Sequence, residues 1–165
     1  MNVKIEQKNI LFTAFVGTSA ELLIKDIDEH KTLFLPNDKI KDSEKLIKMI
    51  SNEKYGYVIS FGQRPNIKNK VHIETTSKRG EISIDTEFDC EKLKCLFEKN
   101  GITAKISHNA GTSFCNELYY NGLKNIYENG LNTKMVFVHI PFEKNIDNFT
   151  DFKRKVLQTI GGMDV

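Results

Sequence analysis

Apolar residues along this chain fall into two alternating patterns: short, largely apolar runs and longer stretches with one apolar face. The short runs are typical of strands buried on both faces of a sheet. They lie at 9–15, 31–35, 55–61, 102–107 and 134–140. Apolar residues spaced three or four apart predict helices. These helices are expected at 20–27, 42–51, 89–100, 113–129 and 147–160. Residues 71–75 and 82–84 alternate in polarity, which predicts half-exposed strands around 77–80.

Buried strands that alternate with helices of this length indicate an α/β fold. We expect a doubly wound, mostly parallel sheet with helices on both faces. No internal repeat or low-complexity linker divides the chain, so a single domain over 1–165 is predicted. Ligands of such sheets bind beyond the carboxyl ends of the strands. That rule selects the loops at 15–19, 62–68, 108–114 and 139–142.

Composition and charge exclude several classes of function. No apolar run approaches the ~18 residues that span a bilayer, so no membrane insertion is expected. Residues 1–8 lack the apolar core of a signal peptide, which predicts a cytoplasmic protein. Lys and Arg number 24 against 22 Asp and Glu, with no basic stripe, so nucleic acid is not an expected partner. Three cysteines are an odd number, which leaves at least one free thiol.

The most informative segment is 107–120, Ser-His-Asn-Ala-Gly-Thr-Ser-Phe-Cys-Asn-Glu-Leu-Tyr-Tyr. It places Cys115 in the first turn of a predicted helix, after a strand and a loop of small residues. The positive end of the helix dipole is expected to lower the pKa of this thiol, and free backbone N–H groups can stabilise an oxyanion. Cys115 is therefore a candidate nucleophile, with a buried structural cysteine as the alternative.

His139 ends the 134–140 strand, where Pro141 interrupts the strand pairing. At that edge an imidazole can take the proton of the Cys115 thiol and return it to a leaving amine, the minimum for acyl transfer. His72 alternates with two apolar residues and is interpreted as structural. Spacing typical of zinc ligands is absent, so no metal site is predicted.

These residues resemble the pyroglutamyl peptidase I family, also called pyrrolidone-carboxylate peptidases. Residues 110–116, Ala-Gly-Thr-Ser-Phe-Cys-Asn, are similar to the family's nucleophile motif A-G-T-[YF]-[VL]-C-N. Residues 138–142, Val-His-Ile-Pro-Phe, are similar to its [IV]-H-[IV]-P-[YF] motif, which bears the catalytic histidine. The resemblance implies a doubly wound α/β fold and removal of an N-terminal pyroglutamyl residue from peptides. It also implies no cofactor and often a homo-oligomer.

The third catalytic position departs from the family pattern. The family has a glutamate just before an Arg-Val-x-Ile-Asn strand, and residues 70–74, Lys-Val-His-Ile-Glu, fit that strand. Asn69 therefore stands where the glutamate belongs and is predicted to orient His139, as an asparagine does in papain-like enzymes. Glu74 is a nearby carboxylate, but the alternation from Val71 does not place it toward the histidine.

Four residues are predicted to bind substrate, by the same resemblance. Phe15 and Phe142 would form a small apolar pocket, and Gln63 would hydrogen-bond the lactam. Arg64 would face the substrate carbonyl or support its loop. The segment after Phe15 and the loop at 63–69 are shorter than in typical members.

Three functions remain open at this point. The first is a cysteine exopeptidase that removes pyroglutamyl residues, and the second is a divergent amidase that acts on another small acyl amide. The third is a non-catalytic homologue that binds a small ligand. A phosphorylase-like activity would need a phosphate-binding glycine loop, for which 62–64 is a weak candidate. Expected partners are a peptide or small acyl-amide substrate and a second copy of the chain.

Overall fold

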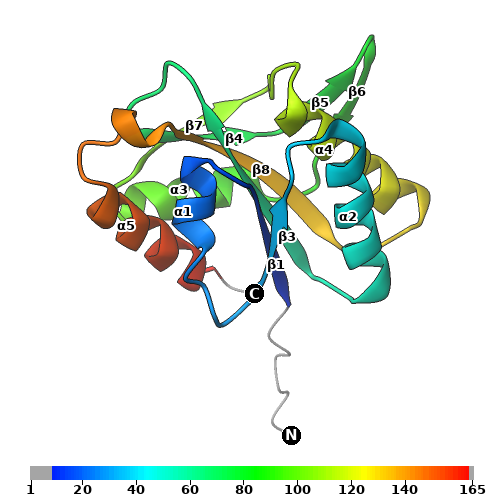
Figure 1. Cartoon of the computed structure of the whole chain (residues 1–165), viewed down its shortest axis with the longest axis horizontal. Coiled ribbons are helices and arrows are strands. Elements are labelled where there is room, and N and C mark those ends of the chain that lie inside the picture. Colours follow the sequence, from blue (N-terminus) through cyan, green and yellow to red (C-terminus); the bar gives the residue numbers. More distant parts are fainter. Residues whose placement is uncertain (1–8, 164–165) are drawn as a thin grey trace, which may run out of the picture.

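The computed structural model describes residues 9–163 and forms one large sheet flanked by helices (Figure 1). Residues 1–8, from which a cytoplasmic location was predicted, lie outside the described part, as do 164–165. The strands are β1 (Ile10–Phe15), β2 (Lys31–Leu35), β3 (Tyr57–Arg64), β4 (Lys70–Glu74), β5 (Thr76–Arg79), β6 (Ile82–Asp85), β7 (Thr103–Ser107) and β8 (Lys134–Pro141). The helices are α1 (Ser19–Ile24), α2 (Lys39–Asn52), α3 (Cys90–Lys99), α4 (Phe114–Glu128) and α5 (Phe149–Gly161), with a 3-10 turn, η1, at Glu143–Asn145.

Six strands form the sheet in the order β2-β1-β3-β8-β4-β7. The first four run parallel, which confirms the predicted mostly parallel α/β sheet. β4 pairs with β8 in the antiparallel direction, and β7 runs parallel to β4. The two strands at this edge are therefore reversed, a feature that residue patterns do not show.

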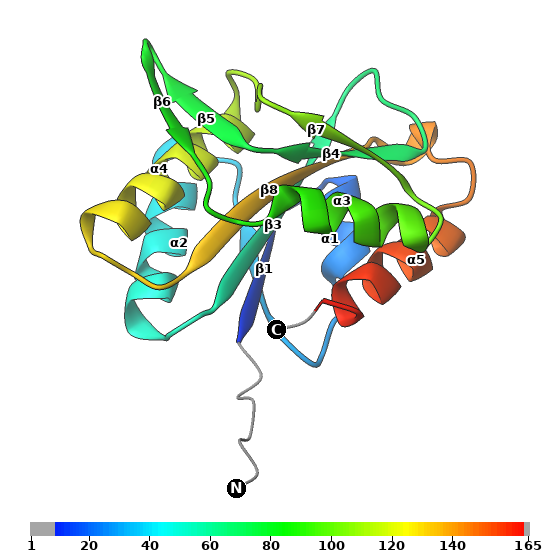
Figure 2. The ribbon, with the colours of Figure 1, turned by 180° about the vertical axis from the view of Figure 1, so that it is seen from behind.

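Helices cover both faces of the sheet, and each face has its own hydrophobic cluster (Figures 1 and 2). One cluster joins the sheet to α1, α3 and α5, and includes Leu23, Phe97 and Val156. The other joins it to α2 and α4, and includes Leu46 and Leu123. Both clusters are built on the same sheet, from which we infer a single domain over the described residues. None of the helices within 9–163 is long and apolar enough to span a bilayer.

β5 and β6 form a separate hairpin that projects beyond the sheet (Figure 2). Gly80 makes its turn with a φ of +59°, a left-handed conformation that glycine adopts without strain. The hairpin packs on α4 through Asn116, whose side chain accepts from the backbone N–H of Lys78 at 3.0 Å and donates to its carbonyl at 2.8 Å. The residue next to Cys115 thus anchors the segment that follows β4.

Candidate active site

Three adjacent strands bring chemistry-bearing residues together on the face covered by α2 and α4. In register, Gly62 of β3 lies beside His139 of β8, and His139 lies opposite His72 of β4. Residues paired directly across neighbouring strands point to the same face of a sheet. One row of positions therefore crosses the sheet at the level of His139, which is buried with 3% of its surface exposed.

Cys115 reaches this row from the first turn of α4. A Cβ atom placed on Gly62 would lie 2.6 Å from the Cys115 Sγ and 2.7 Å from the Phe137 Cζ, so only a glycine lets the thiol approach β3 this closely. The Phe137 ring in turn lies 4.9 Å from the His139 ring, centroid to centroid. Gly62 is the shared neighbour of the thiol and the imidazole, and both groups lie at one place on the sheet.

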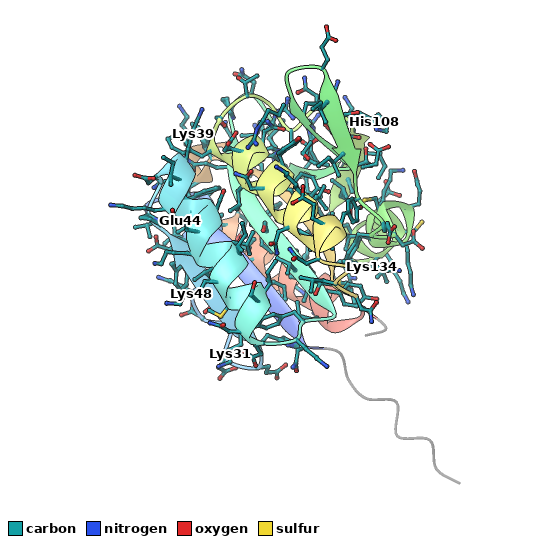
Figure 3. The ribbon with its side chains drawn as sticks, turned by 90° about the vertical axis from the view of Figure 1, so that its right-hand side faces the viewer. Lys31, Lys39, Glu44, Lys48, His108 and Lys134 are labelled. Carbon is teal, nitrogen blue, oxygen red and sulfur yellow. The ribbon has the colours of Figure 1, made fainter. Side chains whose placement is uncertain are left out.

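The start of α4 is also held by α2. Figure 3 looks onto these two helices, which lie side by side in front of the sheet, with Lys39 at one end of α2. The Lys39 Nζ lies 6.0 Å from the centroid of the Phe114 ring, so the beginnings of the two helices meet. The first backbone N–H groups of a helix have no carbonyl partner within it. Those of α4 are therefore available beside Cys115 to stabilise an oxyanion.

Glu74, at the end of β4, holds the imidazole of His139. The His139 Nδ1 donates to Glu74 Oε1 at 2.8 Å, and the Glu74 side chain is fully buried. The same oxygen accepts from Arg64 Nη1 at 3.1 Å, and Arg64 also donates to the carbonyl of Asn109 at 3.0 Å. With Nδ1 bound to the carboxylate, Nε2 remains as the nitrogen that can act as a base.

This geometry corrects the role given to Asn69. Its side chain donates to Asp147 Oδ2 at 2.8 Å and accepts from the Asp147 backbone N–H at 2.9 Å. Asn69 therefore ties the segment before β4 to the segment after β8, and Glu74 is the residue that orients His139. His72 and Glu74 are two residues apart on β4, and His72 lies opposite His139, so alternation does place Glu74 on the His139 side. Both faces of β4 are buried, so its polar positions face the site and not solvent.

The structure also corrects the expected acidity of Cys115. Burial and the negative charge of Glu74 raise the pKa of the Cys115 thiol to about 12, against the lowering effects of Arg64 and the Ser113 side chain. The first turn of α4 does not compensate for the removal of the thiol from water. Cys115 is therefore a neutral thiol at neutral pH, and its proton has to leave as it attacks a substrate.

Alkylation of Cys115 in the free protein is accordingly expected to be slow at neutral pH. Its rate should rise about tenfold with each pH unit and reach no plateau below about pH 10, because only the thiolate reacts. The measurement is iodoacetamide labelling from pH 6 to 10, followed by peptide mass spectrometry in a Cys95→Ser background, since Cys95 is exposed. A plateau near pH 7 would instead reveal a preformed thiolate and contradict the neutral thiol.

The predicted substrate-binding residues are only partly gathered at this site. Phe15 is 3% exposed and belongs to the same hydrophobic cluster as Cys115. Phe142 follows β8 and is half-buried, with the Lys144 Nζ 5.9 Å from its ring centroid. Gln63 turns toward α1, where its Oε1 accepts from the Ser19 backbone N–H at 3.1 Å. Arg64 binds Glu74 and the carbonyl of Asn109, contacts that neither of its two predicted roles names.

Known proteins resemble this chain over most of its length. The family model described as pyroglutamyl peptidase matches residues 49–151. A pyrrolidone-carboxylate peptidase of Thermoanaerobacter sp. is 35% identical over 120 residues, which cover 60% of this chain and 59% of that protein. Pyrrolidone-carboxylate peptidase 1 of Caldanaerobacter subterraneus is 32% identical over 166 residues, which cover 81% and 82%.

Solved structures show the same fold at lower identity. Pyroglutamyl peptidase I of Bacillus amyloliquefaciens superposes with a TM-score of 0.81 at 17% identity, over 93% of this chain and 95% of that one. The pyrrolidone carboxyl peptidase of Thermococcus litoralis gives 0.78 at 17% identity, over 94% and 92%. The chain spans 59% of the length of the Thermoanaerobacter relative. The family model nevertheless matches more than half of this chain, residues 49–151, and the chain belongs to the pyroglutamyl peptidase family.

Proposed function

We propose that this chain is a cysteine peptidase that removes an N-terminal pyroglutamyl residue from peptides. The observation that carries the proposal is the arrangement of Cys115, His139 and Glu74 on one face of the sheet. It supplies a nucleophile, a base with one free nitrogen, and a buried carboxylate 2.8 Å from the other nitrogen. This is the set of roles in a nucleophile–base–carboxylate triad, which is recognised by geometry and not by sequence order.

In the first half-reaction, Cys115 Sγ attacks the acyl carbon of the pyroglutamyl amide while the thiol proton passes to His139 Nε2. The negative oxygen that forms lies near the first backbone N–H groups of α4. Glu74 stabilises the imidazolium through Nδ1. The tetrahedral intermediate then breaks its carbon–nitrogen bond, the leaving amine takes the proton from Nε2, and a thioester remains on Cys115.

In the second half-reaction, a water molecule attacks the thioester while His139 Nε2 takes one of its protons. The carbon–sulfur bond breaks, the proton returns to the sulfur, and free pyroglutamate leaves. The raised pKa of Cys115 fits this cycle, because a basic thiolate forms only as the proton moves to His139. Phe15, in the same cluster as Cys115, supports an apolar surface for the pyrrolidone ring.

The test is hydrolysis of fluorogenic aminoacyl amides by the purified chain under reducing conditions. Release of aminomethylcoumarin is expected from the L-pyroglutamyl amide and not from the L-prolyl amide, whose ring has no lactam carbonyl. The Cys95→Ser variant serves as a matched control and should keep the activity, since Cys95 is exposed on α3. No release from the pyroglutamyl amide would overturn the proposed specificity.

A divergent amidase is the second candidate, and the Gln63 contact with Ser19 favours it. The side-chain carbonyl expected to help recognise the lactam already accepts a hydrogen bond from α1. Turnover of a different acyl amide, with none of the pyroglutamyl amide, would establish this reading. A peptide substrate and a homo-oligomer remain predictions that follow from the family resemblance, and a cytoplasmic location remains the prediction drawn from residues 1–8.

A further inference from the structure

At the His139–Glu74 pair, three buried polar atoms have no hydrogen-bond partner within residues 9–163. They are Nδ1 and Nε2 of His72 and the second carboxylate oxygen of Glu74, Oε2. His72 is 8% exposed and the Glu74 side chain is fully buried. Buried polar atoms without partners are costly, and native proteins keep few of them. Three in one place, next to the proposed catalytic base, call for a shared role.

The strand register places these atoms together. His72 and Glu74 are two residues apart on β4, so their side chains leave the same face of the strand. His72 lies directly opposite His139 on β8, and directly paired residues of antiparallel strands have Cα atoms about 4.5–5.5 Å apart. Glu74 pairs with Phe137 and reaches diagonally to His139. The Glu74 carboxylate thus holds the imidazole of His139, and the imidazole of His72 leaves the same face of β4 two residues away.

Burial and the positive charges nearby favour the neutral form of the His72 ring. Burial lowers the pKa of His72, and the positive charges of Arg64 on β3, Lys70 on β4 and Lys105 on β7 lower it further, against the opposing effect of Glu74. Arg64 is also bonded to Glu74. A neutral imidazole has one N–H donor and one acceptor. His72 therefore has a donor to offer, and Glu74 Oε2 is a charged acceptor on the same face of the strand.

We propose that His72 is a positioning residue that donates a hydrogen bond to Glu74 Oε2 through one bridging water molecule. This contact fixes the carboxylate so that Oε1 faces His139. It also disperses the carboxylate charge over a second donor, so that Glu74 stabilises the His139 imidazolium less strongly and Nε2 gives up its proton more readily to the leaving amine. The inference rests on the proposed peptidase function. It gives a positioning role to His72, which its sequence pattern indicates to be structural.

The test compares His72→Ala, His72→Asn and the control His30→Ala, which changes a histidine remote from β4, just before β2. The Nδ1–H proton of His139, which lies in the hydrogen bond to Glu74, is observed by ¹H–¹⁵N NMR in the substrate-free proteins. With one donor lost, Glu74 should accept more strongly from His139, so His72→Ala should move the Nδ1–H resonance of His139 downfield. His72→Asn, which restores an N–H donor without a titrating ring, should bring it back toward wild type.

Kinetics on the pyroglutamyl amide provide the second measurement. His72→Ala should lower kcat about tenfold with KM unchanged, as expected for loss of a hydrogen bond to a charged group. An Nδ1–H resonance of His139 that is the same in wild type and His72→Ala, or an equal loss of kcat in the Ala and Asn variants, would overturn the inference. The NMR measurement needs no turnover, so it decides the role of His72 even if the pyroglutamyl amide is not hydrolysed.

Discussion

Replacement of Cys115 with alanine is expected to remove hydrolysis of the pyroglutamyl amide, with a fall in kcat of at least about 10⁴-fold. The reason is that no other described thiol lies on this face of the sheet near His139. Cys90 belongs to the opposite hydrophobic cluster, and Cys95 is exposed on α3. Binding of substrate should survive, because the alanine leaves the surrounding apolar surface in place. The measurement is coumarin release by purified variant and wild type, side by side.

Cys115→Ser is the informative companion to this variant. It keeps a nucleophilic atom of similar size against Gly62 but removes the sulfur, and it should also be nearly inactive. Mass spectrometry after brief mixing with substrate should detect the thioester on wild type alone. Residual turnover of Cys115→Ala within tenfold of wild type would show that the chemistry does not use this thiol.

The second large effect is expected at Glu74. Glu74→Gln keeps the shape of the side chain but loses the charge that stabilises the His139 imidazolium, and kcat should fall about 10³- to 10⁴-fold. KM should change little, because Glu74 contacts His139 and Arg64 and is not expected to touch substrate. The measurement is a full kinetic comparison, with the melting temperature as a check that the buried site still folds.

Asn69→Ala is the matched control, since it changes the residue at the position where the family carries its glutamate. Its loss breaks the contacts with Asp147 and leaves the His139–Glu74 pair intact. We expect near-normal kcat. The opposite pattern, an inactive Asn69→Ala and an active Glu74→Gln, would restore the role first assigned to Asn69.

Local patterns in the sequence were enough to predict most of the fold. The apolar runs and helical spacings correspond to β1, β2, β3, β7, β8 and the five helices, because burial on a face follows from residue spacing. The reversal of β4 and β7 could not be predicted in this way. Strand direction depends on which strands pair across long sequence separations, and β4 pairs with β8 from 65 residues away at the Glu74–His139 contact.

The candidate site was predicted in part for the same reason. Cys115 and His139 lie next to loops at the carboxyl ends of strands, where such sheets bind their ligands. The structure brings the two residues to one place. Glu74 was misjudged because polar residues that alternate with apolar ones usually face solvent, whereas successive residues of β4 from Val71 to Glu74 are all buried. The pKa of Cys115 was predicted in the wrong direction, since the helix position is visible in the sequence and the depth of burial is not.

The contact between Asn116 and Lys78 has a consequence for self-association. β6 covers only one side of β5, and the outer edge of a strand is a template on which a foreign chain can pair. At Lys78 both backbone groups on that edge are already bound by the Asn116 amide, as a neighbouring strand would bind them. The residue that follows the proposed nucleophile therefore occupies the position at Lys78 where a foreign strand would pair, so one helical turn carries both residues.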